Sequence, residues 1–199
     1  FEASWQNGFF YFGGIATDAF GHVYVSDFYN DRIQKFKFDG THVRNIPGQR
    51  SAGLHVDFAG HLVVADLTRN AITRMSLDGE IYSVHSPTLA DGGFNGLWGI
   101  TTDEAGRVYT ADLYDLLGRT IKVFQPVLPK YRQKTTFSVP GGFLTGLVID
   151  QDQNLIVGVA NNYDPGFIKK VTTSGTYISD VGTGYLDPYS IRTTSDGNL

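Results

Sequence analysis

The 199-residue chain contains no cysteine, which excludes disulfides, thiolate metal sites and a cysteine nucleophile. It also lacks a strong charge of either sign, because 16 basic and 20 acidic residues leave a formal net charge of −4. Nucleic-acid-binding proteins usually carry a basic field, so binding to nucleic acid is disfavoured. The missing cysteines slightly favour an extracytoplasmic compartment, secreted or periplasmic, but leave the localisation unknown.

Long apolar runs and common enzyme motifs are absent as well. No stretch approaches the ~18 apolar residues of a membrane-spanning helix, so no membrane span is predicted. The sequence has no G-x-S-x-G elbow, no P-loop and no G-x-G-x-x-G. It begins at Phe1 without a basic-then-apolar leader, which indicates a processed chain or a piece of a longer one. No segment keeps the apolar spacing of a helix over three turns.

The sequence does contain a repeat, marked by an Asp that opens a short polar turn. The turn DAFG at Asp18 is followed by equivalents at Asp57, Asp103 and Asp150, and a fifth copy begins at Thr194. Asp accepts backbone hydrogen bonds in such turns, and Gly supplies the positive φ. The successive spacings of 39, 46, 47 and 44 residues lie near the ~40–45 residues of a four-stranded propeller blade.

Each unit is predicted to form four short strands. Runs such as Val23–Ser26 and Ile33–Phe36 are rich in β-branched and aromatic residues, and Asp39-Gly40 is a strong hairpin signal. In the third unit, residues 125–134 contain two prolines and several charges, which predicts an exposed loop before the last strand.

The repeat predicts one all-β domain, a β-propeller segment of four-stranded blades. Residues 1–12 are expected to be the outer strand of a preceding blade and a linker, followed by blades at 13–46, 52–85, 97–139 and 145–181, and by the start of a further blade at 189–199. Blades bury their faces only against neighbouring blades, so about two further blades are expected, from the same chain or from another.

The first unit, GGIATDAFGHVYVSDFYNDRIQKFKFDG (residues 13–40), resembles the NHL repeat almost throughout, and residues 94–112 are also similar to it. The fourth unit departs, with Gln153 in place of the turn glycine and Val159 where the family has Asp. The resemblance implies a six-bladed propeller of NHL type. Family members include RNA-binding and protein-binding domains, bacterial sensor ectodomains and, in a related branch, a peptide-amidating lyase, so shape is implied more than function.

Three acidic residues, Asp27, Asp66 and Asp112, recur just after the second strand of their units. They could form a ring of carboxylates near the propeller axis, or each could brace its own loop by accepting hydrogen bonds. Their recurrence favours the brace, because a residue present in every regular unit serves the repeat. A binding site is expected where the units differ.

The loops between the second and third strands, and those between units, lie on one face of a propeller. They carry aromatic residues beside Asn and Arg, which is typical of recognition surfaces. Trp98 and the run Phe9–Phe12 are expected to pack between blades instead. The predicted partner-binding residues are Tyr29, Asn30, Arg69, Tyr114, Asn161, Asn162 and Tyr163.

The five histidines are not expected to converge as zinc ligands would. His22 and His61 share a turn position on the face opposite these loops, His42 and His85 fall in outer strands, and His55 falls in an inner strand. Lactonase-like six-bladed enzymes hold calcium in the channel, to which Asn95, Asn161 and Asp187 could contribute, but no acidic residue in an inner strand supports this. No catalytic residue, metal or cofactor is predicted.

The sequence therefore favours a non-catalytic β-propeller scaffold whose loop face binds a protein, peptide or glycan partner. Two alternatives stay open: a metal-dependent hydrolase or lyase with its site at the propeller channel, and an RNA-binding NHL domain. An RNA-binding domain would show a steep salt dependence of binding.

Overall fold

The structure is a computed structural model that describes residues 8, 11–88, 93–113, 120–127, 130–161, 164–185 and 191. Sixteen strands in this part of the chain form four antiparallel four-stranded sheets, and the strands of each sheet are consecutive in the sequence. The prediction of a propeller of four-stranded blades is confirmed. Of the predicted outer strand and linker at 1–12, residues 1–7, 9 and 10 lie outside the described residues, and so does all of the further blade predicted at 189–199 except Ile191.

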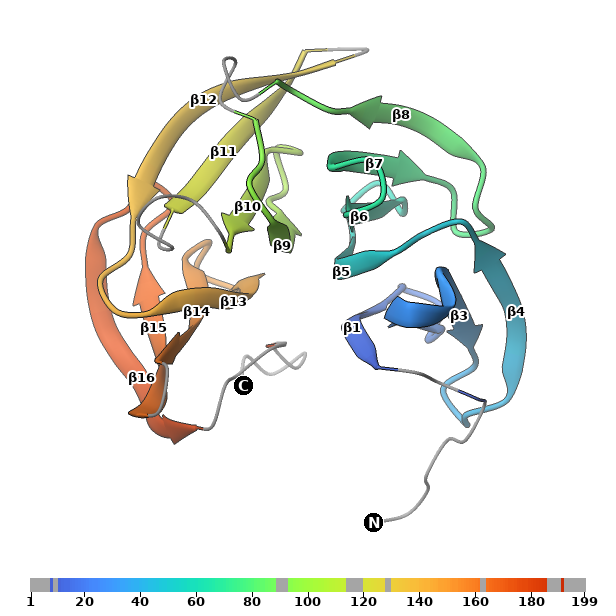
Figure 1. Ribbon diagram of the computed structural model, residues 1–199, viewed down its shortest axis with the longest axis horizontal. Helices are drawn as coiled ribbons and strands as arrows, with labels where there is room; N and C mark the ends of the chain where they lie inside the picture. Colours follow the sequence, from blue (N-terminus) through green and yellow to red (C-terminus); the bar gives the residue numbers. More distant parts are fainter. Residues whose placement is uncertain are drawn as a thin grey trace.

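The first blade contains β1 (Phe12–Thr17), β2 (Val23–Asp27), the 3-10 helix η1 (Phe28–Asn30), β3 (Arg32–Phe36) and β4 (His42–Pro47). The second contains β5 (Ser51–Val56), β6 (Leu62–Asp66), β7 (Ala71–Met75) and β8 (Ile81–His85). The third contains β9 (Leu97–Thr102), β10 (Val108–Asp112), β11 (Thr120–Val127) and β12 (Lys130–Ser138), and the fourth β13 (Phe143–Ile149), β14 (Leu155–Asn161), β15 (Asp164–Val171) and β16 (Tyr177–Tyr185). The blades form an open arc with the first strand of each blade innermost (Figure 1).

Glycine allows the inner strands to approach one another closely. Gly14, Gly53, Gly99 and Gly146 stand at the same place, four residues before the Asp of each turn. A Cβ at Gly53 would lie 2.5 Å from the carbonyl oxygen of Trp98 in the next blade, and one at Gly14 would lie 2.8 Å from the amide nitrogen of Leu54. A larger residue would therefore push adjacent blades apart.

The apolar core lies between blades and not within one blade. Tyr24 of the first blade packs in one cluster with Leu62 and Met75 of the second. Val63 of the second blade shares the next cluster with Phe124 of the third, and a further cluster joins the third and fourth blades. Because side chains alternate along a strand, each blade presents one apolar face to each neighbour. No helix in the described part of the chain is long and apolar enough to cross a membrane.

The prediction of an exposed loop at residues 125–134 is wrong for 125–127 and 130–134, because β11 and β12 pair there. Gln125 pairs with Arg132, and Pro126 pairs with Tyr131. Proline is tolerated there because β10 begins at Val108, opposite Phe124, so Pro126 has a neighbouring strand on one side only. The half-buried Tyr131 ring packs against the core between the second and third blades.

The Asp of each strand-one-to-strand-two turn holds its turn together as predicted. The Asp18 carboxylate accepts hydrogen bonds from the backbone N–H groups of Phe20 and His22, both at 2.9 Å, and from the Tyr24 hydroxyl at 2.9 Å. Burial alone would raise the pKa of Asp18, but these hydrogen bonds and the His22 ring together hold this pKa below its ordinary value. In the third blade, burial and the charge of Asp103 raise the pKa of Tyr109 to about 12.

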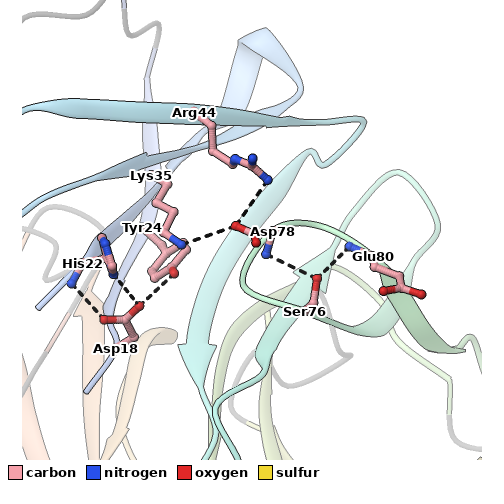
Figure 2. A network of polar contacts seen from close by, with 8 residues as sticks. All are labelled: Asp18, His22, Tyr24, Lys35, Arg44, Ser76, Asp78 and Glu80. Carbon is pink, nitrogen blue, oxygen red and sulfur yellow. Dashed lines mark hydrogen bonds and ion pairs between the residues drawn. The ribbon is translucent and has the colours of Figure 1, made fainter. Parts of the chain in front are cut away.

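Figure 2 shows how this turn lies beside a contact between the first two blades. Lys35 and Arg44 of the first blade reach the Asp78 carboxylate of the second, with N···O distances of 3.4 and 3.3 Å. The Ser76 hydroxyl accepts hydrogen bonds from the backbone N–H groups of Asp78 and Glu80, which fixes the turn that carries the carboxylate. The β7–β8 turn of one blade is thereby held against the preceding blade.

Candidate functional site

The antiparallel order of the strands gives the arc two distinct faces. One face carries the connections between second and third strands, such as η1 between β2 and β3, and also the links between blades; we call it the loop face. We call the opposite face, with the first-to-second-strand and third-to-fourth-strand turns, the turn face. The predicted partner-binding residues come from the loop face.

Asp27 supports the loop face of the first blade from beneath. Its side chain is fully buried, and it accepts hydrogen bonds from Asn30 Nδ2 at 2.9 Å, Arg32 Nε at 2.8 Å and Gln34 Nε2 at 2.9 Å. Asn30 Nδ2 also donates to the Gly8 carbonyl at 3.0 Å. The carboxylate thus ties the loop to strand β3 and to the chain that enters the blade, which confirms the predicted brace.

The second and third blades use the same carboxylate with different donors. Asp66 accepts a hydrogen bond from Arg69 Nη1 at 2.6 Å and another from Thr73 Oγ1 at 3.2 Å. Asp112 accepts one from Lys122 Nζ at 2.7 Å and one from the Asn95 backbone N–H at 2.8 Å. The three carboxylates are therefore saturated braces and do not form an open ring of charges.

The fourth blade lacks this brace, because Val159 occupies the position of Asp27, opposite Phe167. Lys169 lies at the register position of Lys122, and its ammonium group pairs instead with Asp180 on the neighbouring strand at 2.7 Å. An apolar pair stands where the other blades have the buried carboxylate and its register partner, so the loop face is built differently at this end of the arc.

Four aromatic rings meet on the loop face between the first and third blades. The Tyr11 and Tyr29 ring centroids are 5.6 Å apart, and Phe28 lies 5.1 Å from Tyr29. Phe28 also reaches Trp98 of the third blade at 6.1 Å, across the inner end of the second blade. Tyr11 and Tyr29 are 47% and 54% exposed, so this aromatic cluster combines an anchored base with two accessible rings. Its centroid distances are those of favourable aromatic pairs.

Of the predicted residues, the structure brings Tyr29 into this cluster and places Asn30 and Arg69 in the braces. The polar groups of Asn30 and Arg69 are already engaged, Arg69 also with the Gly48 carbonyl at 3.2 Å. Asn161 ends β14, and only its backbone is described. The other three, Tyr114, Asn162 and Tyr163, lie outside the described residues.

The expectation that Phe9–Phe12 pack between blades is wrong for Tyr11 and for Phe12, which is 61% exposed; Phe9 and Phe10 lie outside the described residues. The pairing of β1 with β2 shifts register between Phe12 and Ile15, and Tyr11 adopts a positive φ of 65°. The second and fourth blades shift register at the same place, yet the equivalents of Phe12, Ser51 and Leu144, are fully buried because they pack against the preceding blade. Among the described residues no blade precedes the first, which leaves Phe12 exposed. Tyr11 is not among the binding residues predicted from the sequence, because that prediction assumes that the aromatic residues of this run are buried. The position of Tyr11 in a loop that differs among the blades could have indicated an exposed binding residue.

The histidines lie where the sequence predicted. His22 and His61 bond the Asp of their own turns on the turn face, His42 and His85 lie in β4 and β8, and His55 lies in β5. Among the residues that the structure describes, no group of three or more His, Asp or Glu side chains could hold a metal ion. Asp187 lies outside them.

No family model matches the chain, and no curated protein matches it. Solved structures do. A gluconolactonase from Xanthomonas campestris matches with a TM-score of 0.64 at 18% identity, covering 85% of this chain and 61% of its own. Virginiamycin B lyase from Staphylococcus aureus matches with a TM-score of 0.59 at 17% identity, covering 85% and 54%. A protein of unknown function from Bacteroides caccae gives 0.62 at 13%, covering 89% and 62%.

The chain thus spans 54–62% of the length of these three structures. At such identities the likeness shows the fold alone. The described part of the chain is a β-propeller segment of four blades, related in architecture to the six-bladed propellers of virginiamycin B lyase and gluconolactonase.

Proposed function

We propose that the chain is an NHL-type propeller scaffold that recognises a protein, peptide or glycan partner on its loop face, without catalysis. The observation that carries this proposal is the pair of accessible tyrosine rings, Tyr11 and Tyr29, on the anchored base of Phe28 and Trp98. Tyrosine offers a large, rigid area with a polar tip, which suits recognition of sugar rings and of peptide side chains.

The braces support the proposal because they fix the loops before a partner arrives. Asp27 holds η1, which carries Phe28 and Tyr29, through three side-chain donors. The Phe28 backbone N–H also donates to the Tyr11 carbonyl at 3.0 Å, which joins the two segments of the aromatic cluster. A surface ordered in advance loses less conformational entropy on binding.

A screen followed by alanine substitution tests this function. Wild-type chain is applied to a glycan array and to a random peptide library, and affinities for the selected ligands are measured for Tyr29→Ala and for Tyr11→Ala/Tyr29→Ala. We expect the double variant to weaken binding about tenfold or more, the effect of losing central aromatic anchors. Tyr82→Ala is the matched control, because Tyr82 is 51% exposed but lies on the outer strand β8.

Absence of any selected ligand, or equal binding by the double variant and Tyr82→Ala, would refute this function. Aromatic rings of the base remain in both variants, and the removed rings are half exposed, so the fold is expected to persist. Unfolding curves of all three variants check this directly.

The likeness to two structures named as enzymes favours a second candidate, a hydrolase or lyase with its site near the propeller axis. This candidate predicts turnover, so the chain is incubated with virginiamycin B and with a gluconolactone, each with added divalent cations, and the products are followed by mass spectrometry. A time-dependent mass change would favour the enzyme. Unchanged substrates with a ligand-binding loop face would favour the scaffold.

A further inference from the structure

The first-to-second-strand turns differ among the blades at the residue that follows the turn Asp. This residue is Ala19 in the first blade, Phe58 in the second, Glu104 in the third and Gln151 in the fourth. Phe58 is 83% exposed at the tip of its turn, and Glu104 and Gln151 are also exposed. An aromatic ring, a carboxylate and an amide thus stand at equivalent positions of three consecutive blades, while the Asp beneath them is constant.

These three side chains converge on one cleft of the turn face, with a volume of about 240 Å³. The ends of the inner strands β5, β9 and β13 form its floor, through Val56, Thr102 and Ile149. The cleft is smaller than the ~300–1,000 Å³ of drug-sized ligand sites. It suits one amino-acid side chain or a small molecule. It lies opposite the loop face, so it is independent of the function proposed above.

Two polar side chains of the lining point to a ligand with hydrogen-bond donors. Thr102 is only 7% exposed, yet its hydroxyl oxygen has no hydrogen-bond partner. Gln153 replaces the turn glycine of the other blades and adopts a φ of 61°, where Gly60 has 78° and Gly106 has 75°. L-residues rarely adopt this conformation. Gln153 therefore has a strained backbone, and its side chain adds an amide to the cleft.

The charges of the cleft favour a cation. Its lining contains three carboxylates and no Lys or Arg. Asp103 is neutralised by Arg107, and Asp150 by Lys170 at 2.8 Å, both from outside the lining. Among the described residues none forms an ion pair or hydrogen bond with the Glu104 side chain, which leaves one uncompensated negative charge in the cleft that Phe58 also lines. Carboxylate and aromatic face together suit an ammonium or guanidinium group.

We propose that this cleft on the turn face binds an organic cation, an ammonium or guanidinium group carried by a small amine or by a Lys or Arg side chain. Glu104 pairs with the charge, Phe58 covers the alkyl chain and cation with its ring, and the oxygens of Thr102 and Gln153 accept the remaining N–H donors. A divalent metal ion does not fit, because the described residues offer no group of three His, Asp or Glu ligands.

The test is a titration followed by the backbone amide signals of the cleft in NMR spectra. The probes are n-butylammonium, n-butylguanidinium, the neutral isostere n-butanol, and a blocked Gly-Arg-Gly peptide. We expect saturable shifts at Thr102 and Gln153 with the cations and none with butanol. Tighter binding of the peptide would identify a protein side chain as the source of the cation, and tighter binding of the free amine would identify a small molecule.

Two variants with matched controls decide the roles of the residues. Phe58→Ala is expected to weaken cation binding about two- to fivefold, the value of an exposed cation–π contact. Its control is Phe38→Ala, because Phe38 is 82% exposed on a turn of the same face but does not line the cleft. Glu104→Gln is expected to abolish the preference for cations over butanol, and Glu80→Gln on another turn is its control. Equal shifts with butanol, or affinities of Phe58→Ala and Glu104→Gln equal to those of their controls, would overturn the proposal.

Discussion

At the scale of single residues, the buried carboxylate after the second strand illustrates how one position can be served by different partners. Gln34, Thr73 and Lys122 stand at the same register position on the third strands of the first three blades, and each donates to the Asp of its blade. Lys122 Nζ also donates to the Gly93 carbonyl at 2.6 Å. The Asp112–Lys122 pair has the largest desolvation cost of the three arrangements, because both charges are buried.

The energetic role of this pair can be measured by removing one partner and then both. Lys122→Met leaves the buried Asp112 carboxylate without its counter-ion, and we expect the free energy of unfolding to fall by about 3–5 kcal/mol. Asp112→Val/Lys122→Met removes both charges and should recover part of that loss, because no buried charge is then unpaired, although the Asn95 backbone N–H loses its acceptor. Urea unfolding of the three proteins measures both values. A loss below about 1 kcal/mol in the single variant would contradict a buried, uncompensated charge.

At the scale of strands and turns, the turn between the third and fourth strands is an interlocking part of the blade interface. Gly79 has a φ of 100°, and a Cβ there would lie 2.6 Å from Cγ2 of the buried Ile46 in the preceding blade. Gly175 of the fourth blade has a φ of 95°, and its Cβ would lie 2.5 Å from the Phe137 ring. Glycine is required at these turns for backbone conformation and for close packing together.

Comparison with a second glycine separates the two requirements. Gly21 has a φ of 81° but nothing within 4 Å of a Cβ, so Gly21→Ala tests backbone strain alone and should cost about 1–2 kcal/mol. Gly79→Ala adds the overlap with Ile46, and overpacking of this kind costs about 1–3 kcal/mol more. Thermal and urea unfolding of both variants measure the difference. Equal losses would show that the turn does not press on the preceding blade.

The repeat made the blades predictable, because the Asp turns and the alternating strands are local signals. The features that escaped prediction depend on contacts between distant segments. Phe12 is exposed because no blade precedes the first among the described residues, and the Tyr131 ring, in the extension of β11 and β12, packs against the core between two blades. At the candidate site, Tyr29 was found from its loop position. That Phe58 and Glu104 line one cleft could not be predicted from the sequence, because it depends on how neighbouring blades are arranged around the axis.

At the scale of the whole molecule, the two ends of the arc present half of an interface each. Leu62, Val64 and Met75 of the second blade pack against the first blade. The inner strand of the first blade is open instead, because Ile15 and Phe12 are 37% and 61% exposed, whereas their register equivalents Leu54 and Ser51 in the second blade are fully buried. At the other end, Val148, Ile156 and Ile168 pack with Ile191 only. We therefore infer that further blades, from the same polypeptide or another, close the ring.

Substitutions at equivalent positions test ring closure. Leu54→Asp places a charge inside a complete interface and is expected to unfold the chain, since a buried unpaired charge costs several kcal/mol. Ile15→Asp places the same charge at the equivalent position of the open half. Produced alone, the 21.9 kDa chain should associate through that half, so light scattering should give a higher mass for wild type and the monomer mass for Ile15→Asp. A wild-type monomer at every concentration, with Ile15→Asp as destabilised as Leu54→Asp, would mean that this face is already covered within the chain.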